Sequence, residues 1–219
     1  YQPQRGDFVR EALKQGLELE RKLGQNPYRL GVIGSTDSHT ALSSAEEDNF
    51  HGKLATDSIP ANKNSKWNDD GPGATGWAMS ASGMAAVWAV NNSRLDIMDA
   101  LNRREVYATT GPRIAVQFYG GAGFTEADLE NADVHTYATS RGVPMGGELS
   151  QPETPSFIVL TAKDSKGANL DRIQIVKGWL DETGLVKEKV FNVAWSDERQ
   201  LNSDGSLPAV GNTVNRKTG

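Results

Sequence analysis

The residues best suited to chemistry lie in the run GSTDSH, residues 34–39. Asp37 and His39 stand two positions apart, so on an extended chain their side chains project to the same side. A carboxylate oxygen and an imidazole nitrogen are both good ligands for zinc, manganese or iron. The same residues also suit a polar turn, in which Asp37 accepts hydrogen bonds from nearby backbone amides. The pair therefore indicates either a divalent metal site or a structural turn.

Further groups that could serve such a site follow closely in the sequence. Glu46 and Glu47 would add carboxylates to its mouth, and His51 begins the loop that comes after it. An exposed acidic helix start and a solvated histidine are the alternatives, and the pattern alone favours them. We expect His135, much later in the chain, to be a solvated surface residue.

The elements before this run would position it. Residues 8–23 carry apolar side chains near helical spacing, which predicts an amphipathic helix, with Gly24 as its C-terminal stop. The short apolar run 30–34 predicts a buried strand. Helix followed by buried strand is typical of an α/β layer or barrel. Asp37 and His39 would then lie at the carboxyl end of a strand, where β/α barrels carry their catalytic groups.

The rest of the chain predicts a change of architecture near residue 111. The expected elements are a strand over 83–90, a helix capped by Ser93 through about Arg104, a short helix from Thr125, strands over 157–162, 172–180 and 185–194, and a hairpin turn over 181–184. We therefore expect α/β structure over 1–110, with a long loop over 40–76, and a mostly antiparallel β region over 111–219.

Composition excludes several classes of function. The 219 residues carry 23 Lys and Arg against 28 Asp and Glu, a net charge of 23 − 28 = −5, without a long basic run, so nucleic acid is not an expected partner. The absence of cysteine excludes disulfides and thiolate ligands. No apolar run reaches membrane-spanning length. We expect a soluble protein, and the sequence leaves the bacterial cytoplasm and the periplasm both open.

Six separated blocks, in the same order, resemble the bacterial family called domain of unknown function 3604. They are GSTDSH (34–39), EEDNF (46–50) with GK (52–53), AAVWA (85–89), ALNRREVYATTG (100–111), VPMGG (143–147) and LDRIQIVKGW (170–179). The resemblance covers nearly the whole chain. That family is similar to the PHP superfamily, named for polymerase and histidinol phosphatase, whose distorted β/α barrel holds up to three metal ions.

The resemblance implies a metal-dependent hydrolase. The last metal motif of that superfamily is an Asp-x-His after a barrel strand, and Asp37 and His39 match it. The resemblance implies that the two side chains bind different metal ions of one cluster. The implied substrate is a small molecule with a phosphoester, another ester or an amide-like bond, and the implied metals are zinc, manganese or iron. The superfamily's first motif, His-x-His, is not in this chain. We therefore expect a C-terminal piece of a longer protein, inactive alone, in which a β-sandwich-like region follows the end of the barrel.

Two interpretations stay open at this point. In the hydrolase, Arg103, Arg104 and Arg113 would contact an anionic substrate, although salt bridges between the barrel and the β region explain them more simply. In the alternative, the chain is a non-catalytic binding or assembly module whose β region packs against a partner or a sugar. In either case, exposed strand edges could join two copies as a dimer.

Overall fold

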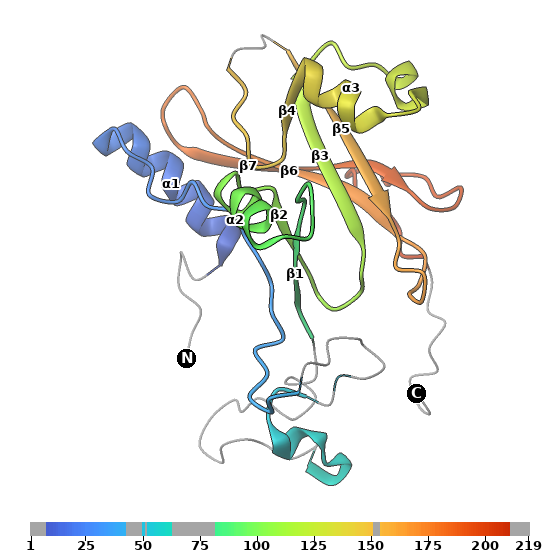
Figure 1. The fold of residues 1–219 in the computed structure, drawn as a ribbon. Helices are drawn as coiled ribbons and strands as arrows, with labels where there is room; N and C mark the ends of the chain where they lie inside the picture. Colours follow the sequence, from blue (N-terminus) through green and yellow to red (C-terminus); the bar gives the residue numbers. More distant parts are fainter. Residues whose placement is uncertain (1–7, 43–49, 51, 63–81, 151–153, 211–219) are drawn as a thin grey trace. The chain divides into compact units, whose positions relative to one another are not determined.

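The computed structural model of the chain describes residues 8–42, 50, 52–62, 82–150 and 154–210. Figure 1 shows its helices and strands in chain order. The chain divides into two compact units, one formed by Tyr1–Leu30 with Ala168–Gly219 and the other by Gly31–Gly167. The sequence analysis expected an α/β region over 1–110 and a β region over 111–219, and this boundary stays a prediction.

The first unit combines one helix with a two-stranded ribbon. Helix α1 (Val9–Leu23) ends at Gly24, whose φ of 75° is the left-handed conformation that glycine adopts without strain. Strands β6 (Arg172–Leu180) and β7 (Val186–Trp195) pair antiparallel, with an irregular register between Ile173 and Gln174. The predicted helix 8–23 and the predicted strands 172–180 and 185–194 are confirmed.

The turn between β6 and β7 is fixed by one side chain. Asp181 accepts hydrogen bonds from the Thr183 hydroxyl at 2.6 Å, the Thr183 amide at 3.0 Å and the Leu185 amide at 2.9 Å. These bonds lower the pKa of Asp181 to about 2, with the Thr183 hydroxyl as the largest cause. The predicted hairpin turn over 181–184 is therefore confirmed, with a carboxylate as its organising group.

The second unit begins its regular structure with a small β hairpin. Strands β1 (Met84–Val87) and β2 (Val106–Thr109) pair antiparallel and are joined through helix α2 (Arg94–Asn102). The Ser93 hydroxyl accepts a hydrogen bond from the Asp96 amide, as the sequence predicted. Two short 3-10 helices, Ala55–Ser58 and Pro60–Asn62, lie in the long region between α1 and β1.

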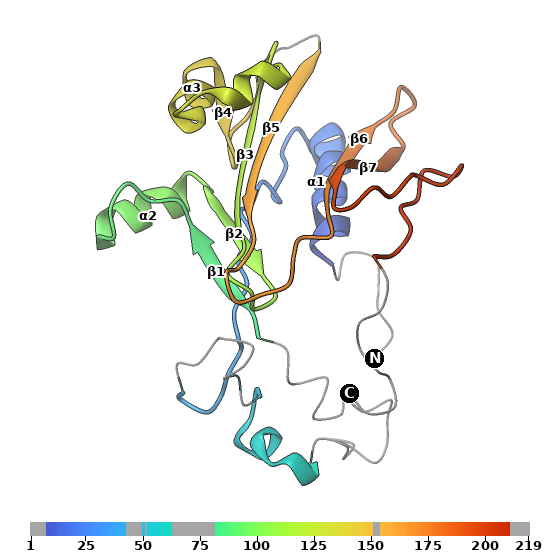
Figure 2. The same ribbon diagram turned by 90° about the vertical axis from the view of Figure 1, so that its right-hand side faces the viewer.

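A three-stranded antiparallel sheet forms the remainder of this unit, in the order β4–β3–β5 (Figures 1 and 2). Its elements are β3 (Ala115–Ala122), the 3-10 helix Glu126–Glu130, α3 (Val134–Arg141), β4 (Gly142–Pro144) and β5 (Pro155–Ala162). Helix α3 covers one face, where Tyr119, Ala138 and Ile158 form a small buried core. The predicted strand 157–162 and the Thr125 capping box are confirmed.

Two aromatic side chains of the hairpin attach it to the start of β3. The Trp88 indole Nε1 donates a hydrogen bond to the carbonyl oxygen of Val116 at 2.8 Å, and the Tyr107 hydroxyl donates one to the carbonyl oxygen of Ile114 at 3.1 Å. The two rings stack with their centroids 6.4 Å apart. Strand β4 pairs only with Tyr119–Gly121, so these contacts replace a strand partner along the first half of β3.

The strand predicted over 30–34 is wrong. These residues have no regular secondary structure, and Leu30 and Ile33 are 64% and 55% exposed. The reason is that a short apolar run does not by itself distinguish a strand from an extended segment without a hydrogen-bond ladder. Across the described ranges the fold is mixed α/β with small antiparallel sheets, and it contains no closed barrel. No helix there is long and apolar enough to cross a membrane.

Candidate functional site

The segment that leads to Asp37 lies directly against the β1–β2 hairpin. A side-chain carbon added to Gly31 would lie 2.8 Å from Val106, and one added to Gly34 would lie 3.0 Å from the carbonyl oxygen of Met84. From the other side, a carbon added to Gly83 would lie 2.3 Å from the carbonyl oxygen of Ser35. Glycine is required because the two backbones approach too closely for side chains. The hairpin therefore holds the segment that carries the candidate site.

The turn after this segment is formed by short polar side chains. Asp37 has φ 50°, a left-handed conformation that Asp tolerates better than most residues. The Ser38 amide donates to the Thr36 hydroxyl at 3.2 Å, and the Ser38 and Thr40 hydroxyls lie 2.8 Å apart. Such side-chain to backbone bonds favour turns over regular structure. The sequence prediction of a polar turn at these residues agrees with this geometry.

The turn brings together the two residues predicted as ligands. Oδ1 of Asp37 lies 3.4 Å from Nε2 of His39, and the two side chains are 65% and 57% exposed. The other carboxylate oxygen of Asp37 forms an ion pair with Nζ of Lys53, and the His39 amide donates to the carbonyl oxygen of Lys53 at 2.7 Å. Lys53 thus belongs to this site, although sequence reasoning did not single it out.

The charges around Asp37 keep its carboxyl group ionised. The hydrogen bond and charge of Lys53 lower the pKa of Asp37 most, and His39 lowers it further. An ionised carboxylate is the form that ligates a metal ion. The same ion pair means that Asp37 already has a cationic partner within the chain. A metal ion bound by Asp37 would share the carboxylate with the Lys53 ammonium group, and the two positive charges would repel each other.

The geometry fits part of a metal coordination shell. Two ligands about 2.0–2.1 Å from a tetrahedral zinc ion lie about 3.3–3.4 Å apart, and the Asp37 to His39 separation is 3.4 Å. Zinc sites use at least three protein donors. Within the described ranges, no group of three His, Cys, Asp or Glu side chains could hold a metal ion. The pair therefore fits as two of the required ligands.

The other predicted site residues divide into two groups. Glu46, Glu47 and His51 lie outside the described residues. Arg103 donates from Nε to Glu105 at 2.8 Å, which raises the Arg103 pKa. Nη2 of Arg104 lies 3.8 Å from Glu148.

Arg113 contacts a carboxylate through its backbone. Its amide donates to Asp164 at 2.7 Å. A carboxylate thus lies beside each of the three arginines. The role of these arginines as substrate contacts stays a prediction.

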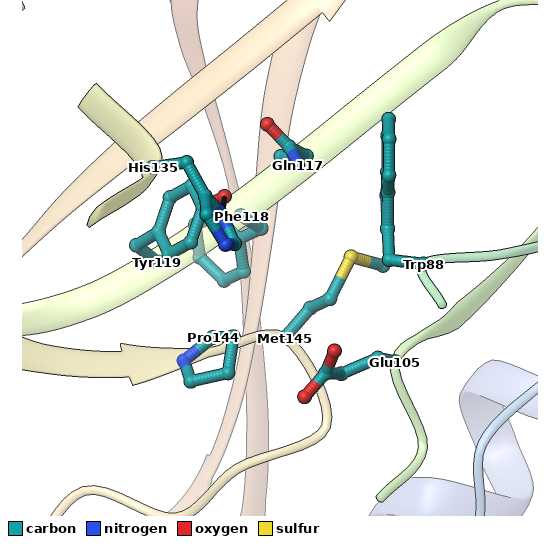
Figure 3. A pocket seen from close by; sticks show the side chains of 8 residues that line it. All are labelled: Trp88, Glu105, Gln117, Phe118, Tyr119, His135, Pro144 and Met145. Atoms are coloured by element: carbon teal, nitrogen blue, oxygen red, sulfur yellow. Dashed lines mark hydrogen bonds between the residues drawn. The ribbon is translucent and has the colours of Figure 1, made fainter. Parts of the chain in front are cut away.

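A hollow in the second unit combines several reactive side-chain types (Figure 3). Its volume is about 10 Å³, far below the usual size of a ligand pocket. It is lined by Trp88, Glu105, Gln117, Phe118, Tyr119, His135, Pro144 and Met145. Figure 3 shows the Met145 side chain extending toward Trp88 across the hollow. The hollow is a packing feature between the hairpin and β3.

His135 differs from its predicted surface role in one respect. Its Nδ1 shares a hydrogen bond with the Tyr119 hydroxyl at 2.7 Å, so it satisfies a nearly buried phenol. Burial raises the pKa of Tyr119, and the charges of Glu105 and Asp133 raise it further. Since the phenol stays neutral at physiological pH, the pair has a structural role in closing the core beside α3.

The described residues form a mixed α/β fold in which Asp37 and His39 lie together on an exposed turn. The chain belongs to the family described as "Protein of unknown function (DUF3604)", whose family model matches residues 1–219. This confirms the family resemblance found in the separated sequence blocks. No curated protein and no solved structure matches the chain.

Proposed function

We propose that the chain is the C-terminal part of a PHP-like, metal-dependent hydrolase in which Asp37 and His39 are two of the metal ligands. The observation that carries this proposal is the 3.4 Å separation of Asp37 Oδ1 and His39 Nε2 on an exposed turn. Both donor types suit zinc, manganese or iron. The remaining donors would come from Glu46, Glu47 or His51, or from preceding segments of a longer protein.

The course of the leading segment supports a barrel-like parent fold. Gly31 lies beside Arg104 and Val106, and Gly34 lies beside Ala108 and Thr109, so the segment runs in the same direction as β2. Parallel neighbours are the building principle of β/α barrels. In the proposed parent, this segment would be completed as a barrel strand by neighbours that precede it, and it would deliver Asp37 and His39 to the mouth.

The chain's own residues would prepare the site for the ion. A bound metal would supply a hydroxide-like water for attack on a phosphoester, another ester or an amide-like bond. Lys53 pairs with one carboxylate oxygen of Asp37, Oδ2, and the other, Oδ1, faces His39 and would bind the ion. The backbone bond from His39 to Lys53 keeps the imidazole beside the carboxylate. With two ligands only, the chain alone is expected to be inactive.

The test is metal content by plasma mass spectrometry on the longer protein, after reloading with zinc, manganese and iron. The double variant Asp37→Asn/His39→Gln should lose stoichiometric metal and hydrolysis of phosphate esters together. Asp197→Asn is a matched control, because Asp197 is also exposed and has φ 62°. Asparagine tolerates this conformation, so the control should keep its metal. A longer protein that takes up none of the three metals would refute the hydrolase.

The second candidate is a non-catalytic binding or assembly module. The Lys53 ion pair favours it, because a lysine that neutralises Asp37 explains the turn without any metal. In this case Asp37→Asn would lower the melting temperature and leave the metal content of the longer protein unchanged.

Dimerisation through an exposed strand edge is also a proposal. Among the described residues, strand β5 pairs only with β3 and is therefore an edge strand of the sheet β4–β3–β5. Unpaired edges of this kind can join a second copy. A mass measured by light scattering at high protein concentration would test it, and a monomeric mass would argue against it.

A further inference from the structure

The two faces of the β6–β7 ribbon have different environments within the first unit. Helix α1 lies against one face: a side-chain carbon added to Gly178 would lie 3.4 Å from Lys14, and Lys14 pairs with Glu188 at 3.1 Å (Figure 2). Successive residues of a strand point to opposite faces. The residues that alternate with Gly178 and Glu188 therefore lie on the face away from α1.

This second face, which we call the lysine face, combines lysines with aromatic rings. The register places Ile175 opposite Phe191, Lys177 opposite Lys189 and Trp179 opposite Lys187. The three lysines are exposed, and Phe191 is 38% exposed. The three pairs contain no acidic residue, although the whole chain has a net charge of −5. The lysine face is thus a positive area on an acidic protein.

The placement of two lysines on this face destabilises the ribbon. Like charges directly opposite each other on adjacent strands repel, and Lys177 is directly opposite Lys189. Neither forms an ion pair with any residue that the structure describes. Each ammonium group instead lies over a ring, Lys177 at 5.3 Å from the centroid of Trp179 and Lys189 at 4.9 Å from that of Phe191. The rings offset only part of the repulsion.

We propose that the lysine face binds an acidic oligosaccharide, one with carboxylate or sulfate groups on successive sugars. The charge complementarity comes from Lys177, Lys189 and Lys187, of which only Lys187 has a carboxylate partner, Asp181 at 3.4 Å. The rings of Trp179 and Phe191 offer apolar faces to the C–H side of a sugar ring once the lysines turn toward the anionic groups. Ammonium pairs with anions also account for the otherwise unfavourable cross-strand lysines.

The experiment uses the whole 219-residue chain and an oligogalacturonate of defined length, measured by calorimetric titration at low salt. The double variant Lys177→Gln/Lys189→Gln should bind about tenfold more weakly or worse, because two charge-assisted contacts are removed. The control Lys163→Gln/Lys166→Gln removes the same charge from exposed lysines elsewhere and should bind as the wild type does. Circular dichroism verifies folding of each variant, and loss of cross-strand repulsion should leave the first double variant at least as stable.

Four further ligands decide between the outcomes. A sulfated oligosaccharide of the same length should bind, because it also carries anionic groups on successive sugars. The methyl-esterified form of the same oligosaccharide should bind weakly, because it lacks the charges. A single-stranded oligonucleotide and polyglutamate should also bind weakly, because they present no sugar face with carboxylates at matching positions. Absence of oligogalacturonate and sulfated-oligosaccharide binding would overturn the proposal. Equal binding of oligonucleotide or polyglutamate would also overturn it, since the face would then attract any polyanion.

Discussion

Replacing Gly83 by alanine should weaken the support of the candidate site. The added carbon would lie 2.3 Å from the carbonyl oxygen of Ser35, far inside van der Waals contact. The clash involves two backbones, so no side-chain rotation relieves it. Overpacking of this kind costs about 1–3 kcal/mol, and the lower entropy of unfolded alanine returns about 0.5–1 kcal/mol. The expected net loss is therefore about 1 kcal/mol at the middle of these ranges and at most about 2.5 kcal/mol.

The loss should be visible in both stability and the site. For a chain of this length, about 1 kcal/mol corresponds to about 2–4 °C in melting temperature, so Gly83→Ala should lower the melting temperature by about 2–4 °C. Because the clash pushes on Ser35, the His39 imidazole resonances and the hydrogen exchange of residues 34–39 should change as well.

Gly178→Ala is the matched control. Its added carbon would lie 3.4 Å from Lys14 and 3.9 Å from the carbonyl oxygen of Lys187, which are ordinary contacts. Its melting temperature should equal or exceed that of the wild type, because alanine loses less entropy than glycine on folding. If Gly83→Ala were as stable as this control and left His39 unchanged, the segment 31–35 would not lie against the hairpin as described.

Three other substitutions test the contacts around the site and the turns. Lys53→Gln should raise the pKa of Asp37 toward its ordinary value, seen by carboxyl NMR titration. A carboxyl group whose pKa is depressed in the folded protein stabilises the fold above the ordinary carboxyl range, and this stability is lost as the pH falls. The free energy of unfolding of Lys53→Gln should therefore fall less between neutral and acidic pH than that of the wild type. An unchanged titration of Asp37 would show that Lys53 does not pair with it. Thr183→Ala should raise the pKa of Asp181 above its present value of about 2; stability from Asp181 is present above pH about 4 and falls as the pH approaches 2, and a titration that stays near 2 would contradict the turn. Trp88→Phe should cost about 1–2 kcal/mol in denaturant unfolding, because the carbonyl oxygen of Val116 loses its donor; Trp67→Phe, outside the described residues, provides a spectroscopic reference, and equal stability of wild type and Trp88→Phe would mean that the indole bond contributes nothing.

Periodic patterns made much of the fold predictable. The α1 stripe, the apolar run 157–162 of β5 and the turn after β6 each carry a local physical signal, and the structure has all three. The run 30–34 lacked such a signal, since five apolar or glycine residues suit several backbone states. Helix α3 was missed because its sequence, VHTYATSR, has no apolar stripe; Asp133 caps it and only Ala138 is buried. Strand β2 was too short to predict.

The candidate site was predictable in its residue types and not in its partners. The spacing predicted that Asp37 and His39 share one side of an extended chain; they do lie together, but on a turn in which Asp37 has φ 50°. Their contact with Lys53 depends on a backbone bond across fourteen positions in sequence, from His39 to the carbonyl oxygen of Lys53. No periodicity reports such a contact, because it is made by two irregular segments. The sequence therefore predicts that Asp37 and His39 lie close together, and it does not predict that Lys53 joins them.

Lys53 is also the residue that separates the two proposed functions. If the turn is structural, the Lys53 ammonium group is the permanent partner of Asp37, and Lys53→Gln would loosen the turn without any effect on metal affinity. If the turn is half of a metal site, the ammonium group competes with the ion for the same carboxylate. Lys53→Gln should then strengthen metal binding by the longer protein, because the competing cation is gone while both ligands remain. A weaker affinity in that variant would mean that Lys53 supports the metal site, and it would refute the competition argued from this ion pair.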